Sequence, residues 1–131
     1  MTTRKQIRDT AQAIIVGLGL PSVSVYTSEY AEADSLPSVS VFLDGFERSN
    51  DDLEKPQFAG QLHIKIVTNT GGAADDAADS IADPILAAFE ENADLGGALS
   101  EGAAFSAATY LRDPQQPYMA LDLVYDVIWP E

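Results

Sequence analysis

The hydrophobic positions near the start of the chain recur at helical spacing. Between residues 3 and 18, apolar side chains stand three or four positions apart, at Ile7, Ala11, Ile14, Ile15 and Leu18. This period predicts a helix with one buried face. Thr3 is suited to cap the N-terminus of that helix. Gly17, Gly19 and Pro21 predict where it ends.

Two segments with the period of a strand follow. Residues 21–26 (PSVSVY) and 37–42 (PSVSVF) alternate polar and apolar side chains, which predicts two strands of one sheet, with residues 27–36 as a polar link. The dipeptide Asp44-Gly45 predicts the end of the second strand. Residues 47–55 show no apolar period and are predicted to form a loop.

Three further strands are predicted from the same alternation. In residues 57–68, Leu62, Ile64 and Ile66 fall on one face, with Gln61, His63 and Lys65 on the other. In residues 118–129, side chains alternate between the two faces of a strand more regularly than elsewhere in the chain. A strand at residues 103–112 precedes them, and the polar, proline-containing residues 113–117 predict a hairpin between the two.

A second helix is predicted over residues 74–92, after a break at residues 69–72 (NTGG). Its apolar stripe consists of Ala74, Ala78, Ile81, Ile85 and Phe89. Pro84 stands in the middle, where a proline costs a helix about 3 kcal/mol. Because a proline is also favoured at a first helical position, the sequence leaves a second possibility, two short helices at residues 75–82 and 84–92.

The predicted order of elements is α-β-β-β-α-β-β. Strands in two blocks, with helices that need to bury one face each, are typical of an α+β fold in which two helices cover a mixed or antiparallel sheet. The length of 131 residues fits a single domain, expected to span residues 1–131.

The charge of the chain excludes several classes of function. Seven Lys and Arg against 21 Asp and Glu give a formal net charge of −14. This charge disfavours binding to nucleic acid through a basic surface and binding to an anionic membrane. The chain has no cysteine, so disulfides and thiolate chemistry are excluded. The charges are also uneven: residues 66–111 hold eight acids and no cation, whereas Arg4, Lys5 and Arg8 gather at the start.

A search for catalytic motifs predicts that the protein is not an enzyme. The single histidine, His63, falls on the polar face of a predicted strand, and no G-x-S-x-G nucleophile motif occurs. Gly17-Leu-Gly19 lacks a third glycine and follows a helix, and no Lys-Ser/Thr follows Gly71-Gly72, so neither segment forms a nucleotide-binding loop.

Carboxylates are the remaining candidates for a site. Asp122 and Asp126 share a strand face with apolar neighbours, where one wet sheet face also explains them. Asp75 and Asp76, with Asp79, open the second predicted helix. There they stabilise the helix dipole, and they are also suited to a hard divalent cation such as Mg²⁺. We therefore expect no catalytic or cofactor-binding residues, with Asp75 and Asp76 as a candidate divalent-cation site at a subunit contact.

The order of these features resembles the tail terminator proteins of long-tailed bacteriophages, the lambda-type minor tail protein U family. The resemblance covers residues 3–131 and rests on the order and spacing of several patches rather than on one motif. The segments that carry it are residues 30–45 (YAEADSLPSVSVFLDG), 61–64 (QLHI), 81–85 (IADPI), 110–113 (YLRD) and 122–127 (DLVYDV). The chain departs from the family in the Gly71-Gly72 loop and in the alanine-rich residues 73–78 and 103–108.

The resemblance implies a structural virion protein without catalysis. Such a protein is assembled in the cytoplasm of a bacterial host and forms a homo-hexameric ring at the end of the tail tube. The ring stops tube polymerisation and provides the surface for the head–tail connector or completion protein. DNA passes through it without specific binding, and no membrane is involved.

The sequence also permits two other functions. The first is a head–tail completion protein or a tail tube protein, which would share the same assembly logic. The second is an acidic inhibitor that mimics DNA and binds a basic nucleic-acid enzyme, which the net charge of −14 permits.

Overall fold

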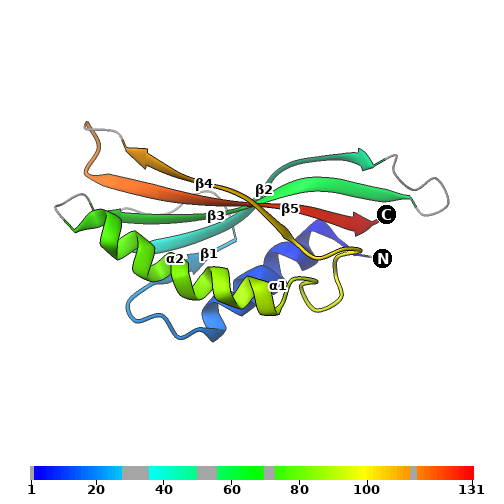
Figure 1. Cartoon of the computed structure of the whole chain (residues 1–131), viewed down its shortest axis with the longest axis horizontal. Helices are drawn as coiled ribbons and strands as arrows, with labels where there is room; N and C mark the ends of the chain where they lie inside the picture. The colour runs from blue at the N-terminus through cyan, green and yellow to red at the C-terminus, as the bar shows by residue number, and fades with distance from the viewer. Residues whose placement is uncertain (1, 28–35, 50–55, 70–72, 113–114) are drawn as a thin grey trace.

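A five-stranded mixed sheet forms the frame of the molecule, in the spatial order β1-β2-β3-β5-β4. The computed structural model describes residues 2–27, 36–49, 56–69, 73–112 and 115–131 (Figure 1). The elements in chain order are α1 (Arg4–Gly17), β1 (Ser24–Tyr26), β2 (Ser38–Ser49), β3 (Gln57–Asn69), α2 (Ala74–Glu91), β4 (Ala104–Arg112) and β5 (Tyr118–Pro130). The predicted α+β class and the order of elements are confirmed.

Both helices lie on the same face of the sheet (Figure 1). The Thr3 side chain accepts a hydrogen bond from the backbone N–H of Gln6 at 3.0 Å, so the predicted N-terminal cap of α1 is confirmed. The helix then buries Ile7, Ala11 and Ile15 against the sheet. The other face of the sheet carries the polar positions of β3 and β5.

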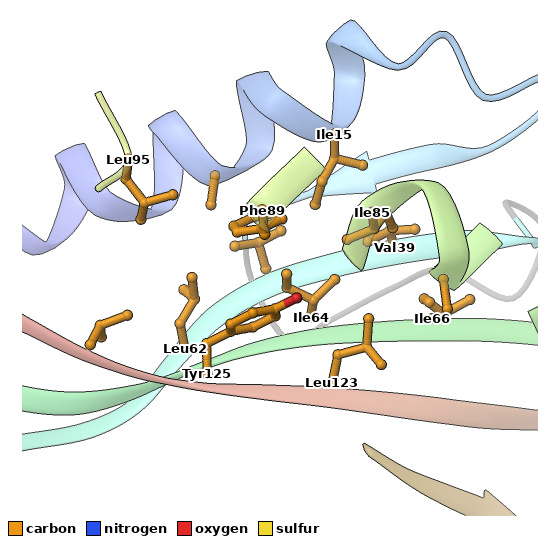
Figure 2. Close-up of a cluster of buried hydrophobic side chains, with 14 of the residues drawn as sticks. Ile15, Val39, Leu62, Ile64, Ile66, Ile85, Phe89, Leu95, Leu123 and Tyr125 are labelled. Atoms are coloured by element: carbon orange, nitrogen blue, oxygen red, sulfur yellow. The ribbon is translucent and has the colours of Figure 1, made fainter. Parts of the chain in front are cut away.

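The core lies between this helix layer and the sheet (Figure 2). The strands β3 and β5 pair over their whole length, which aligns Ile64 with Leu123 and Leu62 with Tyr125 on the helix side. The ring of Tyr125 stacks against Phe89 of α2, with centroids 5.2 Å apart. The alternation that predicted these strands therefore reports the burial of one face.

The strand β2 continues past Asp44-Gly45, so the prediction that it ends there was wrong. Leu43 pairs with Leu62 and Phe46 with Gly60, which leaves one extra residue in β2 and defines a β-bulge. Gly45 has a φ of 155°, a conformation that suits glycine. The predicted loop at residues 47–55 is likewise corrected, since its first three residues belong to β2 and the others lie outside the described residues.

Helix α2 is continuous, so the alternative of two short helices was wrong. Pro84 lies inside the helix. Ile81 on one side of it, and Ile85 and Phe89 on the other, are all buried in the same core. A break at Pro84 would tilt one of these segments off the sheet. We infer that their shared burial outweighs the hydrogen bond that the proline removes.

The first strand is shorter than predicted. Only Ser24–Tyr26 pairs with β2, in parallel, because Ser22 has a φ of 59° and so leaves the extended region. The predicted link at residues 27–36, the break at 69–72 and the turn at 113–117 lie partly outside the described residues.

Candidate functional site

The acids that open α2 face the end of the edge strand β4. The carboxylate of Asp75 accepts a hydrogen bond from Arg112 Nη2 at 2.5 Å, and both side chains are about half exposed. Asp75 and Asp76 occupy the first turn, where the helix offers unpaired N–H groups. The structure therefore joins Asp75 to an arginine 37 residues further along the chain.

A second contact repeats this arrangement one turn further along α2. The phenol of Tyr110 donates a hydrogen bond to Asp79 Oδ1 at 2.5 Å. This bond raises the pKa of Tyr110 above its ordinary value of 10.0, because it stabilises the protonated phenol. Slight burial and the negative charges of Asp79 and Asp75 act in the same direction, and Arg112 acts against them. Two side-chain hydrogen bonds thus connect β4 to α2.

The acids at the start of α2 supply only part of a site for a divalent cation. Carboxylate oxygens suit Mg²⁺, but the guanidinium of Arg112 already occupies one oxygen of Asp75. In the described part of the chain, no three histidine or acidic side chains come close enough together to hold a metal ion. A cation at Asp75 and Asp76 would therefore need further ligands from outside this group, and the cation site remains a prediction.

The strand β4 is exposed along its entire length. All nine residues from Ala104 to Arg112 are exposed, on both faces of the strand. Phe105 is 51% exposed and Leu111 is 44% exposed. No charged residue occurs in β4 before Arg112. A row of uncharged side chains at a sheet edge is an unusual surface for an acidic protein that works alone.

His63 lies on the face of the sheet that the helices do not cover. Its Nδ1 is 2.9 Å from Asp122 Oδ2, and its ring stacks on Phe42 with centroids 5.1 Å apart. Its Nε2 faces a second carboxylate, Asp44, at 3.6 Å. Within the described residues, the polar contacts of His63 are to these two carboxylates, and neither is a hydroxyl or thiol that an imidazole could activate. We interpret the group as a link between β2, β3 and β5.

Asp126 does not join this group. Its carboxylate accepts a long hydrogen bond of 3.4 Å from Gln61 Nε2 on β3, and its side chain is exposed. The wet sheet face that the sequence offered as one explanation of Asp122 and Asp126 describes the Asp126 position well. Asp122 is half-buried through its contact with His63.

Two features of the surface were not predicted from the sequence. The first is the pair of side-chain hydrogen bonds between α2 and β4, which join residues 31 and 37 positions apart. The second is the complete exposure of β4. One signal was visible, since Asp75, Asp79 and Asp83 recur every four residues and so mark one flank of the helix.

Comparisons with known proteins relate the chain to components of virions. A family model described as phage minor tail protein U matches residues 3–129. A similar solved structure is a chain from the virion of a native gene transfer agent (GTA) particle. It is 17% identical with a TM-score of 0.54, and the match covers 99% of this chain and 96% of that chain. At this identity the match shows a shared fold.

A search of curated protein sequences finds no match. Of the helices described, neither is long and apolar enough to cross a membrane. Because the family model spans nearly the whole chain, the protein belongs to the phage minor tail protein U family and is a structural, non-enzymatic component of a virion tail.

Proposed function

We propose that the protein is a tail terminator. In this proposal, six copies form a ring on the finished tail tube, stop its polymerisation and offer a surface to the head–tail connector or completion protein. Family membership supports a place in the tail. The observation that carries the assembly part is the uncovered edge strand β4.

An exposed sheet edge such as β4 is a surface to which another chain can pair. A strand at an edge presents unpaired backbone groups, and proteins that work alone protect such edges with charges, prolines or short strands. β4 has nine residues, no proline and one charge, at its last position. Since a tail component works inside an assembly, a neighbouring protein is available to cover this edge.

The two edges of the sheet differ, which favours a ring over a two-fold dimer. A ring closes through heterologous contacts, in which one surface of a subunit meets a different surface of the next. One edge of this sheet is the three-residue strand β1 beside α1, and the other is β4 beside α2. A subunit with two unlike edges is suited to such closure.

Charge sets a condition on ring closure. Six copies would carry a formal charge of 6 × −14 = −84, and self-repulsion on that scale opposes assembly. We propose that a divalent cation such as Mg²⁺ relieves it at a subunit contact, with Asp75 and Asp76 as ligands. Because Arg112 already binds Asp75, Asp76 is the carboxylate more open to the cation, and the neighbouring copy would complete the site.

The same charge suits the passage of DNA. A wall of like charge does not adhere to the phosphate backbone, so an acidic ring would let the duplex slide through without specific binding. In this proposal, the subunits assemble in the cytoplasm of the bacterial host and remain in the virion tail.

Electron microscopy of assembled tails tests the proposal. A terminator appears as one ring at the head-proximal end of each tube, and tubes assembled without it grow past their normal length. A ring that repeats along the tube would instead identify a tail tube protein. Normal tubes that fail to join heads would identify a completion protein, and a stable monomer or dimer bound to a basic enzyme would identify a DNA mimic.

A further inference from the structure

We propose that the two unlike edges of the subunit bind each other in neighbouring copies. The cationic α1 edge of one copy binds the acidic flank of α2 beside β4 in the next copy. This inference rests on the proposed ring and names the surfaces that close it.

The acidic flank is one stripe along α2. Asp75, Asp79, Asp83 and Glu90 follow each other at spacings of four, four and seven residues, which places them on one side of a helix. The first two are held by Arg112 and Tyr110 of β4, so this side of α2 faces the edge strand.

The third and fourth members of the stripe have no such partner among the described residues. Ala108 and Phe105, the next β4 residues on the helix side, pair with Leu123 and Tyr125 of β5, and neither side chain can donate a hydrogen bond to a carboxylate. Asp83 and Glu90 are exposed, and among the described residues neither is in an ion pair. Two acids of the acidic flank are therefore paired with β4, and the other two, Asp83 and Glu90, are available to another chain.

The opposite edge of the subunit carries the complementary charge. Helix α1 contains Arg4, Lys5 and Arg8 against one acid, Asp9, whereas α2 contains six acids and no cation. Lys5 is already paired with Asp9. In a chain with seven Lys and Arg, this concentration makes the α1 edge the natural partner for an acidic surface.

The position of Arg8 places this charge at the outer side of α1. Gln12 donates a hydrogen bond through Nε2 to the backbone oxygen of Val25 in β1 at 3.2 Å. Arg8 stands one turn before Gln12 and so lies on the same flank, toward the β1 edge of the sheet. In the part of the chain that the structure describes, Arg8 is in no ion pair.

Arg4 is held in place beside it. Its guanidinium lies over the ring of Phe46, 4.3 Å from the centroid. Stacking fixes the plane of an arginine while leaving the N–H groups at its edge free to bind a carboxylate. Arg4 and Arg8 thus supply two cations for the unpaired acids of the α2 flank in the next copy.

Substitutions that reverse the charge of either surface distinguish the effect of this contact on assembly from that of the general repulsion between copies. Variant one carries Arg4→Glu and Arg8→Glu, and variant two carries Asp83→Lys and Glu90→Lys. We expect each alone to remain monomeric under conditions where the wild type forms hexamers. General repulsion predicts the opposite for variant two, since it raises the net charge of the chain by four units toward zero.

Mixing the two variants gives the sharpest result. In an alternating ring of six, every contact again joins a basic edge to an acidic one, so an equimolar mixture is expected to recover the hexamer mass by light scattering. Glu90→Lys and Glu91→Lys form the matched control pair. Both change the charge by two units on adjacent residues, but only residue 90 lies on the flank, so only Glu90→Lys should weaken assembly.

The possible failures can be told apart. If the wild type forms no hexamer with or without Mg²⁺, the proposed ring is wrong. If the wild type and both double variants all form hexamers, or if the mixture stays monomeric, this contact is wrong and the ring closes elsewhere. Near-wild-type thermal unfolding of each variant is required to show that the substitutions act on assembly.

Discussion

The guanidinium of Arg112 lies 2.5 Å from the carboxylate of Asp75 and ties the last residue of the edge strand β4 to the first turn of α2. One turn along α2, Tyr110 and Asp79 form a second link. These two contacts and the pairing with β5 hold β4, whose residues are otherwise exposed on both faces. The strand is thus positioned by the subunit but left uncovered by it.

Replacing Arg112 tests how far this link stabilises the fold. Arg112→Gln is expected to lower the free energy of unfolding by less than about 1 kcal/mol, because exposed ion pairs contribute little in water. Urea denaturation measures the change. Arg48→Gln removes another exposed pair, with Glu131, and should have a similar effect. A loss of several kcal/mol for Arg112→Gln alone would show that the link is structural.

Tyr125 predicts how stability depends on alkaline pH. Its burial raises the pKa of its phenol to about 12 from an ordinary value of 10.0. Because the folded-state pKa is the higher one, the contribution is complete below pH 10 and is lost as pH rises toward 12. The free energy of unfolding should fall there by roughly 1.4 kcal/mol per pH unit.

The matched variant for this prediction is Tyr125→Phe. It keeps the ring that stacks on Phe89 and removes the titrating group, so its urea midpoint should depend less on pH between 10 and 12. An unchanged pH dependence in Tyr125→Phe would assign the alkaline loss of stability to other groups.

Gly60 marks a close approach of two backbones in the sheet. A Cβ added there would stand 2.5 Å from the backbone oxygen of Gly45 and 3.2 Å from the indole of Trp129. Gly60→Ala is therefore expected to lower the free energy of unfolding by about 1–3 kcal/mol, as overpacking does. Gly17→Ala is the control, since a Cβ there meets nothing within 4 Å. Equal midpoints for the two variants would contradict the close approach across the bulge.

Much of the fold was predictable because burial leaves a local period. The alternation in β5 and the helical spacing in α1 each record one buried face, and both elements formed as predicted. Asp44-Gly45 misled because the same dipeptide suits a turn and a bulge, and only the partner strand β3 decides between them. Pro84 misled because long-range packing of Ile85 and Phe89 overrides a local preference.

The candidate site was less predictable, because its contacts join residues that are far apart in the sequence. The spacing of Asp75, Asp79 and Asp83 showed a flank, but its partners Tyr110 and Arg112 come from a strand that the fold brings beside it. The exposure of β4 was also hidden, because Ala and Ser are compatible with both burial and exposure.

Asp76 allows the role of a divalent cation to be tested. If Mg²⁺ binds at the start of α2, Asp76→Asn should weaken the Mg²⁺-dependent increase in mass seen by sedimentation. Glu101→Gln removes the same charge elsewhere and should leave the increase intact. If both variants respond to Mg²⁺ as the wild type does, or if monovalent salt at equal ionic strength has the same effect, the cation acts by general screening and not at this site.

In the proposed assembly, the subunit forms a closed ring of six. The most direct measurement is the mass of the wild-type protein in solution at high concentration, by sedimentation and light scattering, with Mg²⁺ and then after addition of a chelator. We expect a hexamer that Mg²⁺ favours and the chelator weakens. A monomer or dimer under every one of these conditions would rule out the closed ring.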